Sequence, residues 1–312
     1  MPERICIVGC GAIGAFYAAH LAQLADLEVW AYDVAAEHVA AINRNGLRLI
    51  GAQTMTATVH ARTDASEIPP CPIGIVATKG TFTAAACAAT EPVFTDAAVC
   101  SVQNGIGNEE LIAHYAPRVM RGVTLPAGRI AAPGVIEVDA VGPTWIGPFE
   151  PAPASDAELH WLGERLNAAG LTTIVRADAR GPQWTKLLFN SATNPLCALT
   201  GLTHGELCDF PPTRRLAGEL VAEGRAVADA LGIGLEEDPE ALIDAAAREN
   251  HQHRPSMLQD VTARRPTEIE TLNGGIVAAG VAGGAPTPLH EAVQALIRGL
   301  ERSWTAGSVD GA

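Results

Sequence analysis

A polar stripe along one predicted helix carries groups that could deliver a proton. A helical pattern runs over residues 183–199, and Lys186, Asn190 and Asn194 recur in it at every fourth position, so their side chains share one face. A lysine is a competent general acid when desolvation lowers its pKa, and its charge stabilises a developing oxyanion. Neutral amides could bind substrate oxygens. Reduction of a ketone by hydride transfer requires groups of these kinds.

The same stripe also has an ordinary interpretation as a solvated helix face. Asparagine is a poor helix former, however, and two asparagines in register with a lysine favour a lined cleft. A later carboxylate, Glu268, has a structural interpretation of its own. Pro266 suits the first turn of a helix over residues 266–282, and Glu268 would then lie near the N-terminus of that helix, where the helix dipole favours negative charge.

A glycine-rich loop near the N-terminus predicts a site for a dinucleotide. Ile5 to Gly14 reads I-C-I-V-G-C-G-A-I-G, a buried strand that turns into a helix whose amide N–H groups can hold a pyrophosphate. Gly9 permits the tight turn, Gly11 lets the backbone approach the diphosphate, and Gly14 lets the helix pack close to the strand. The three-glycine pattern alone is unspecific in a chain with 31 glycines, but the strand before it, the Ala-rich helix after it and the acidic Asp33 supply the expected context. The residues between the glycines complete the expected cofactor-binding loop: Cys10, Ala12 and Ile13.

Asp33, at the end of the second predicted strand, predicts which nicotinamide cofactor binds. A carboxylate at that place accepts hydrogen bonds from the adenosine ribose hydroxyls and would repel the 2′-phosphate of NADP, so we expect NAD rather than NADP. The alternative is that Asp33 is the N-cap of the next helix, because aspartate is a preferred cap. Arg44 and Arg48 follow in the sequence and could offer a phosphate site, but neither stands at the strand end.

Strands and helices alternate through the first half of the chain, which predicts a parallel sheet covered by helices. The expected strands are Arg4–Val8, Leu27–Tyr32, Ile73–Thr78 and Ala97–Val102, and the helices between them include Ala35–Asn43 and Thr83–Ala89. We expect two short antiparallel strands, Val135–Val138 and Thr144–Ile146, with a turn near Gly142-Pro143. A helix over Asp156–Ala169 and a strand over Thr172–Val175 complete this half.

The second half shows no convincing strand. Helical patterns run over residues 183–199, 212–231, 239–250, 266–282 and 287–303, and Gly181-Pro182 marks a boundary before them. We therefore expect an α/β protein of two domains. An N-terminal Rossmann-type parallel sheet domain that binds the dinucleotide would span residues 1–180. An all-α C-terminal domain for substrate and catalysis would span residues 181–312.

Composition limits the classes of protein and partner. Of 312 residues, 48% are apolar and 18% charged, which is typical of a soluble globular protein. No apolar run reaches the roughly 20 residues of a membrane span, and the first strand leaves no room for a signal peptide, so we expect a cytoplasmic protein. A net charge of −14 without a basic stripe argues against nucleic acid. The seven cysteines form no C-x-x-C pair and predict reduced thiols, and Cys10 is either oxidation-sensitive or a small loop filler.

Six ordered blocks together resemble the ketopantoate reductase (2-dehydropantoate 2-reductase) family, over nearly the whole chain from Gly9 to about Leu300. The blocks are G-C-G-A-I-G at 9–14, A-T-K ending in Lys79, Q-N-G-I-G at 103–107, K-L-L-F-N-S-A-T-N-P at 186–195, S-M-L-Q-D at 256–260 and T-E-I-E at 267–270. The resemblance implies an NAD(P)-dependent oxidoreductase, of the type used in pantothenate biosynthesis, that interconverts a 2-oxo acid and the (R)-2-hydroxy acid.

The resemblance also implies a role for each matching residue. Lys186 is implied as the general acid, and Glu268 as the carboxylate that orients this lysine or bonds the substrate. Lys79 and Asn104 follow strands, where the nicotinamide end of the cofactor is expected. The substrate ligands that it implies are Asn190, Asn194 and Ser256, the last for the substrate carboxylate.

Two departures from the family pattern leave the substrate open. The family's NADPH-binding enzymes carry a basic residue near the end of the second strand, where this chain has Asp33. Three residues before Ser256, where the family commonly presents a substrate-binding asparagine, this chain has His253. An NAD-dependent dehydrogenase of a bulkier or aromatic D-2-hydroxy acid, of the D-mandelate type, is therefore the alternative enzyme. A non-catalytic NAD-binding sensor is the other alternative, but it would not need Lys186 together with Glu268.

Two further expectations concern metals and assembly. His251 and His253 have no third ligand at a suitable spacing, so no metal site is expected. The Gly/Ala-rich stretch Gly274–Ala285 permits close helix packing, and we expect a homodimer formed through the helical half.

Overall fold

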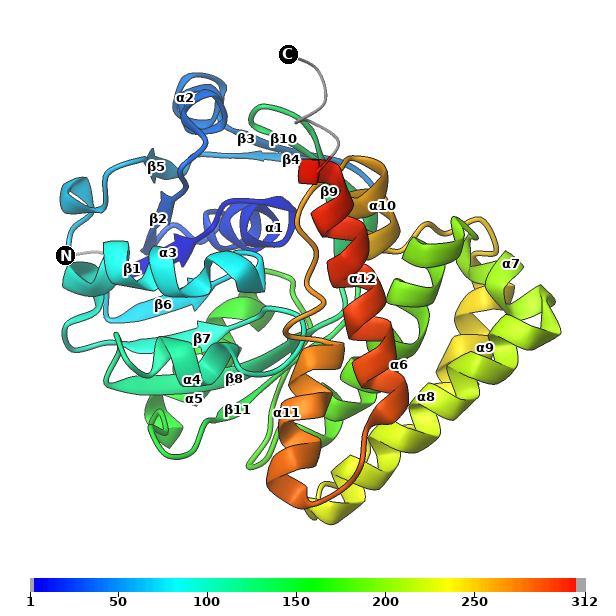
Figure 1. Cartoon of the computed structure of the whole chain (residues 1–312). Coiled ribbons are helices and arrows are strands. Elements are labelled where there is room, and N and C mark those ends of the chain that lie inside the picture. The colour runs from blue at the N-terminus through cyan, green and yellow to red at the C-terminus, as the bar shows by residue number, and fades with distance from the viewer. Residues whose placement is uncertain (1–2, 307–312) are drawn as a thin grey trace. The chain divides into compact units, whose positions relative to one another are not determined.

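The computed structural model describes residues 3–306, which divide into two compact units (Figure 1). The first unit takes the chain up to Gln103 and then Asn108–Ala179. The second unit takes the short segment Asn104–Gly107 and the chain from Arg180 onward. A short loop from the first half of the sequence is thus part of the helical second unit.

An eight-stranded sheet forms the centre of the first unit. Its strand order is β12-β11-β8-β7-β6-β1-β2-β5, and its neighbours are parallel except for β8 and β11. The strands are β1 Glu3–Val8, β2 Leu27–Tyr32, β5 His60–Arg62, β6 Ile73–Val76, β7 Ala98–Ser101, β8 Arg118–Thr124, β11 Thr144–Pro148 and β12 Thr173–Val175. Every residue of β6 and β7 is buried, as expected of parallel strands covered on both faces. The predicted parallel sheet is confirmed.

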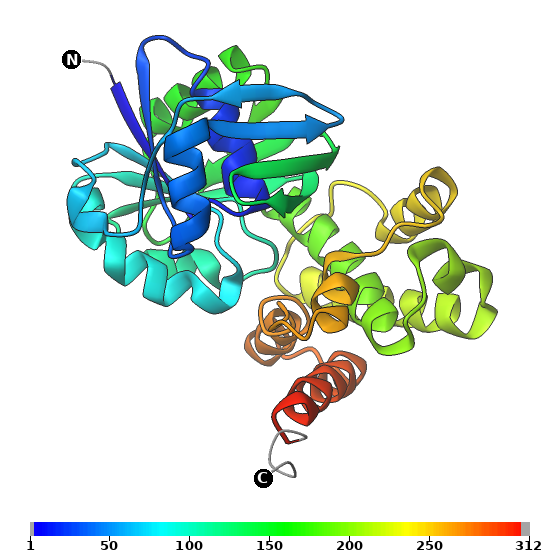
Figure 2. The ribbon, with the colours of Figure 1, turned by 90° about the horizontal axis from the view of Figure 1, so that it is seen from above.

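A second sheet of four strands, which the sequence did not predict, belongs to the same unit. Its order is β4-β3-β10-β9, and its blue and green strands lie side by side in Figure 2. The strands are β3 Leu47–Gly51, β4 Met55–Ala57, β9 Ala127–Ala132 and β10 Val135–Ala140. Helix α1 (Ala12–Leu21) packs against all four and also against β1 and β2 of the main sheet. This position between two sheets explains why its residues from Gly14 to Leu21 are all buried and why the helix is apolar on every face.

The expected hairpin of residues 135–138 with 144–146 is wrong. Both strands exist, but β10 pairs with β9 and β3 in the second sheet, whereas β11 pairs with β8 and β12 in the main sheet. At Gly142-Pro143 the chain passes from one sheet to the other instead of folding back. The carbonyl of Pro143 accepts a hydrogen bond from the N–H of Leu125, directly after β8, which starts the antiparallel pairing of β11 with β8.

Helices cover the main sheet of the first unit as the alternating pattern predicts. They are α1, α2 Ala36–Asn45, α3 Thr83–Thr90, α4 Asn108–Ile112 and α5 Asp156–Ala168, with short 3₁₀ turns at Ala65–Glu67, Gly80–Phe82 and Glu91–Phe94. The first turn of α5 is fixed by a capping box. Ser155 Oγ accepts from the N–H of Glu158, and the Glu158 carboxylate accepts from the N–H of Ser155.

The second unit is helical, and within its described residues no strand occurs. Its helices are α6 Arg180–Thr200, α7 His204–Asp209, α8 Pro211–Ala230, α9 Pro239–Glu249, α10 Ser256–Thr262, α11 Asn273–Gly283 and α12 Pro288–Ala306. Helix α6 packs against α7, α8, α9, α10 and α12, so it forms the centre of this unit. Among the helices of residues 3–306, none combines the length and the apolar character that crossing a bilayer needs.

The predicted helix over residues 266–282 is too long at its start. Helix α11 begins at Asn273, and Pro266 to Leu272 forms a turn before it. Glu268 is therefore not held at a helix N-terminus, and the dipole explanation for its presence is wrong. The turn is fixed by other contacts: the N–H of Thr267 donates to Glu301 at 2.8 Å, and the N–H of Ile106 donates to the carbonyl of Thr271 at 2.9 Å.

Candidate functional site

The glycine loop of the first unit has the geometry that a dinucleotide requires. Gly9 has a φ of +87°, and a Cβ there would lie 2.6 Å from the side chain of Thr78. A Cβ at Gly14 would lie 1.9 Å from the carbonyl oxygen of Gly9, so only glycine lets α1 approach the loop this closely. A Cβ at Gly11 would meet no atom within 4 Å. The space over Gly11 is therefore open, as expected where a diphosphate approaches the backbone.

The residues between these glycines divide between the core and the start of α1. Cys10 is fully buried, and burial raises the pKa of its thiol well above the usual range, so the loop-filler interpretation of Cys10 is favoured over a reactive thiol. Ala12 and Ile13 are the first residues of α1 and remain partly exposed. Their amides lie at the end of the helix where unpaired N–H groups can bind an anion.

Asp33 is not the N-cap of the following helix. Helix α2 begins at Ala36, and its N-cap residue is Ala35. The Asp33 carboxylate is half-buried and accepts two backbone hydrogen bonds, from the N–H of Cys10 at 2.8 Å and from the N–H of Ala35 at 2.8 Å. It thus lies directly beside the glycine loop. Arg44 lies in the last turn of α2 and Arg48 on β3 of the second sheet, so neither belongs to this end of β2.

The loops that follow β6 and β7 are joined by a glutamine that sequence reasoning missed. Lys79 follows β6 and precedes a 3₁₀ turn, whose N-terminal cap position it occupies. Gln103 follows β7, and its amide donates to the carbonyl of Thr78 at 2.9 Å and to the hydroxyl of Thr83 at 2.7 Å. The hydroxyl of Thr83 donates in turn to Asn108 at 3.0 Å. The signal for this glutamine is its place in the Q-N-G-I-G block, directly before Asn104.

The helical unit brings Asn104 and Glu268 together. The Asn104 amide donates to Glu268 Oε2 at 3.2 Å. Gly105 has a φ of +86°, and a Cβ there would lie 2.2 Å from the carbonyl oxygen of Thr271, so the two segments touch through their backbones. Asn104 was expected at the cofactor, with no link to Glu268. The structure makes it a direct partner of the carboxylate, and its contact with the cofactor stays a prediction.

Lys186 lies on α6 in the same unit and is coupled to Glu268. Its side chain is half-buried, and burial lowers the pKa of Lys186 from 10.5 to about 8. The negative charge of Glu268 acts in the opposite direction and raises that pKa. Lys186, Glu268 and Asn104 thus form a cluster of amine, carboxylate and amide, in which the amine is tuned toward neutral pH.

Asn190 and Asn194 follow Lys186 on α6 at one-turn intervals. Asn190 is half-buried, and Asn194 is only 5% exposed and accepts a hydrogen bond from the hydroxyl of Thr193 at 3.4 Å. The solvated-face interpretation of this stripe is therefore wrong for Asn194. How the two amides contact a substrate stays a prediction.

A proline inside α6 is compensated by a buried asparagine. Pro195 has no N–H, so the carbonyl of Ser191 loses its helical partner. The side chain of Asn273, which is fully buried at the start of α11, donates to that carbonyl at 3.0 Å. Asn273 also lies 3.0 Å from Nδ1 of His290. This contact gives the Ser191 carbonyl a partner where the proline removes the helical one, and the N-P pair at 194–195 is the signal for it in the sequence.

Ser256 is at the start of α10, which packs against α6, and His253 lies three residues before that helix. Ser256 is the first residue of α10 and is exposed, and His253 is half-buried. The carbonyl of His253 accepts from the N–H of His204 at 2.9 Å. The ring of His204 is buried against Phe189 of α6, with the ring centres 5.4 Å apart. Burial and, to a lesser extent, His253 lower the pKa of His204 to about 4, so this ring is neutral at physiological pH.

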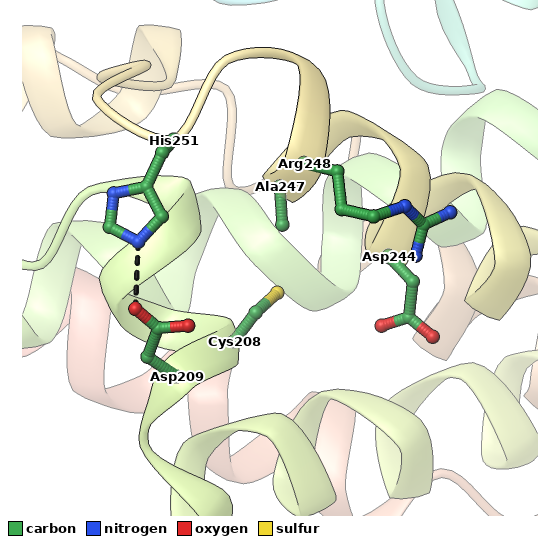
Figure 3. Close-up of a pocket in the computed structure, with 6 residues that line it drawn as sticks. All are labelled: Cys208, Asp209, Asp244, Ala247, Arg248 and His251. Atoms are coloured by element: carbon green, nitrogen blue, oxygen red, sulfur yellow. Dashed lines mark hydrogen bonds and ion pairs between the residues drawn. The ribbon is translucent and has the colours of Figure 1, made fainter.

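The helical unit also has an open hollow of about 310 Å³ beside α7 and α9 (Figure 3). Both of its carboxylates have partners: Asp209 Oδ2 lies 2.7 Å from His251 Nε2, and Asp244 is paired with Arg214 of α8. None of the expected site residues lines it. Within residues 3–306, no group of three or more His, Cys, Asp or Glu side chains is arranged to hold a metal ion.

Comparison with known proteins identifies the chain's relatives. Residues 5–151 match the family model described as ketopantoate reductase PanE/ApbA, and residues 178–301 match the model of its C-terminal part. The 2-dehydropantoate 2-reductase of Pyrococcus abyssi is 31% identical over 299 residues, which cover 96% of this chain and 98% of the relative. That of Pyrococcus horikoshii is 32% identical over 302 residues, covering 96% and 97%.

Solved structures give the same result. The crystal structure of a PanE/ApbA family ketopantoate reductase from Ralstonia eutropha superposes with a TM-score of 0.87 at 30% identity, covering 96% of this chain and 99% of that one. A complex of D-mandelate dehydrogenase with NADH superposes with a TM-score of 0.86 at 25% identity, with the same coverage. With its parallel sheet, its glycine loop and its helical second unit, this chain belongs to the ketopantoate reductase family of nicotinamide-dependent oxidoreductases that act on CH–OH groups.

Proposed function

We propose that this chain reduces a 2-oxo acid to the (R)-2-hydroxy acid, with NADH as the hydride source and Lys186 as the proton source. The first unit would hold the dinucleotide, and the helical unit would hold the substrate and the proton donor. One observation carries the proposal: a lysine with a pKa of about 8 is coupled to Glu268, which accepts a hydrogen bond from Asn104. An exposed lysine without these neighbours would keep its ordinary pKa of 10.5.

Lys186 would protonate the oxygen of the reduced carbonyl. When bound, the reduced nicotinamide supplies the hydride. A pKa of about 8 leaves the Lys186 amine mostly protonated at pH 7, yet able to give up its proton readily. Its positive charge also stabilises the negative charge that develops on the substrate oxygen. In the reverse direction the neutral amine would accept the proton from the hydroxy acid.

Glu268 would set the protonation of the lysine, and Asn104 would hold Glu268 in place. The carboxylate favours the charged amine and so opposes the effect of burial. The Asn104 amide fixes one carboxylate oxygen at 3.2 Å. Asn104 is then a positioning residue of the proton donor, and its proposed place near the nicotinamide end of the cofactor is compatible with this role. Lys79 remains the proposed contact for the nicotinamide end.

The residues of the first unit fit a dinucleotide, and Asp33 favours NAD. The open space over Gly11 and the partly exposed first turn of α1 could receive the diphosphate. Each oxygen of Asp33 accepts one backbone N–H and still has a lone pair for a ribose hydroxyl. A 2′-phosphate in that place would meet the carboxylate and be repelled.

The substrate end is proposed to consist of four residues on α6 and at the start of α10. They are Asn190, Asn194, Ser256 and His253. Small 2-oxo acids such as 2-dehydropantoate, the substrate named for the curated relatives, are the first candidates. The second candidate is a bulkier or aromatic 2-oxo acid, favoured by His253 at the substrate end and by the similarity to D-mandelate dehydrogenase bound to NADH.

Initial rates with a panel of 2-oxo acids, each with NADH and with NADPH, test the proposal. The panel should include 2-dehydropantoate and 2-oxo-2-phenylacetate, which represent the two candidates. We expect turnover with at least one of them and a higher kcat/KM with NADH. Lys186→Ala should reduce that turnover by about two to four orders of magnitude. Turnover near wild type in this variant would remove Lys186 from its role, and equal or better efficiency with NADPH would overturn the assignment of Asp33.

A further inference from the structure

Both backbone polar groups of Cys10, in the middle of the glycine loop, are held by side chains from one short segment. Its N–H donates to Asp33 Oδ2 at 2.8 Å, and its carbonyl oxygen lies 2.9 Å from His38 Nε2. Asp33 directly follows β2, and His38 lies in the first turn of α2. Side chains thus hold both the N–H and the carbonyl of the loop residue between Gly9 and Gly11.

The contacts of His38 define its tautomer. The N–H of Gly134, in the turn between β9 and β10, donates to His38 Nδ1 at 3.1 Å. Because a backbone N–H can only donate, Nδ1 is the acceptor, and the ring hydrogen is on Nε2, where it donates to the carbonyl of Cys10. The side chain is 6% exposed, so water has little access to replace either partner. Both hydrogen bonds depend on this one neutral tautomer.

Gly134, the other partner of His38, is itself firmly placed. It has a φ of +74°, and a Cβ there would lie 3.1 Å from the Cβ of Ala41 on α2. Its carbonyl accepts from the N–H of Arg48 on β3 at 2.9 Å. His38 therefore connects the glycine loop to a turn that is fixed both to α2 and to the second sheet.

We propose that His38 is a positioning residue of the dinucleotide site, which holds the glycine loop in its binding conformation before the cofactor arrives. The imidazole needs no contact with the cofactor for this role, because it acts through the carbonyl of Cys10. A loop that is already ordered has less conformational freedom to lose on binding, and affinity rises accordingly. The inference rests on the proposed binding of the cofactor by this loop.

Three substitutions separate this role from general stabilisation. His38→Leu removes both hydrogen bonds, whereas His38→Gln retains one donor and one acceptor on a side chain of similar reach. His20→Leu is the matched control. His20 is also buried, and its ring nitrogens are also both bonded, to the carbonyl of Ala169 at 2.9 Å and to Gln53 at 2.7 Å. It lies at the end of α1 opposite the loop.

The readouts are the Kd for NADH, from fluorescence titration of the purified chain, and the midpoint of thermal unfolding without cofactor. We expect His38→Leu to raise the Kd about tenfold, as loss of a buried hydrogen bond should. His38→Gln should recover most of the affinity. His20→Leu should lower the unfolding midpoint but leave the Kd within about twofold of wild type. The KM for the 2-oxo acid at saturating NADH should be unchanged in the His38 variants.

Two results would overturn the role of His38. The first is wild-type affinity for NADH in folded His38→Leu, and the second is an equal loss of affinity in His20→Leu. If His38→Leu does not fold, His38→Asn takes its place, because its shorter amide falls short of the Cys10 carbonyl, and wild-type affinity in that variant would also overturn the role. A wild-type chain that fails to bind NADH would instead overturn the proposed function itself.

Discussion

The pH dependence of reduction should report the pKa of Lys186. Burial lowers that pKa from 10.5 to about 8. The protonated fraction of the amine is then roughly nine-tenths at pH 7 and roughly one-tenth at pH 9. Because only the protonated amine can give a proton, kcat/KM for reduction should fall roughly tenfold between these pH values. A lysine with its ordinary pKa of 10.5 would leave the rate nearly flat over this range.

The fall in kcat/KM with rising pH forms the descending limb of the pH profile, and Glu268→Gln should move this limb to lower pH. The carboxylate stabilises the charged amine, so its removal lowers the pKa of Lys186 further and the variant should lose more activity at pH 9 than at pH 6. Glu270→Gln is the matched control. Glu270 is a carboxylate two residues further on, but it is exposed and paired with Arg298 and Gln294. Its neutralisation should leave the limb in place.

Both profiles can be measured from initial rates of NADH oxidation at saturating NADH and low 2-oxo acid, from pH 6 to pH 10 at constant ionic strength. Subsaturating 2-oxo acid makes the rate report kcat/KM, and hence the free residue. A profile that stays flat through pH 9 would refute the tuning of Lys186 by burial. A limb that does not move in Glu268→Gln, or that moves to higher pH, would refute the coupling between the two groups.

Other substitutions test the remaining assignments. Lys186→Met should reduce turnover as Lys186→Ala does and yet raise the free energy of unfolding at pH 7 by roughly 1–3 kcal/mol in chemical denaturation, because the native pKa lies below the unfolded one and the charged amine is disfavoured in the fold. This gain should persist below about pH 8 and fade as the pH rises from about 8 to 10.5; no gain at pH 7 would contradict the assigned burial. Asp33→Arg should shift the ratio of kcat/KM values toward NADPH, and an unchanged ratio would count against the ribose contact. Gly14→Ala should prevent folding of the first unit, because its Cβ would lie 1.9 Å from the carbonyl oxygen of Gly9. Gly11→Ala should still fold, which circular dichroism can check, but it should bind NADH more weakly in a fluorescence titration.

The main sheet and most helices could be predicted because their residue patterns are strong. Parallel strands such as β6 and β7 are continuous apolar runs, and α1 follows a glycine fingerprint. The second sheet was missed because its strands are short and partly exposed, and β9 has no buried residue at all. Pro266 and Glu268 suit a first helical turn and so predict helix before α11, but contacts with Glu301 and Ile106 determine the conformation of this segment instead.

The residue types of the site were predictable, but several partnerships within it were not. Local sequence does not reveal that Asn104 meets Glu268, because the two residues are 164 positions apart. The support of α6 by Asn273 and the clamp on Cys10 by His38 depend equally on long-range packing. Lys186 could be identified as a candidate acid from its spacing, but the lowering of its pKa depends on burial that only the fold provides.

The most direct test of the proton-donor role is a crystal structure of the chain with NADH and an unreactive analogue of the 2-oxo acid. We expect Lys186 Nζ within about 3 Å of the oxygen that represents the substrate carbonyl, with Glu268 still bonded to Asn104. An Nζ atom directed away from that oxygen, with another side chain or a water in its place, would contradict the assignment of Lys186 as the proton donor.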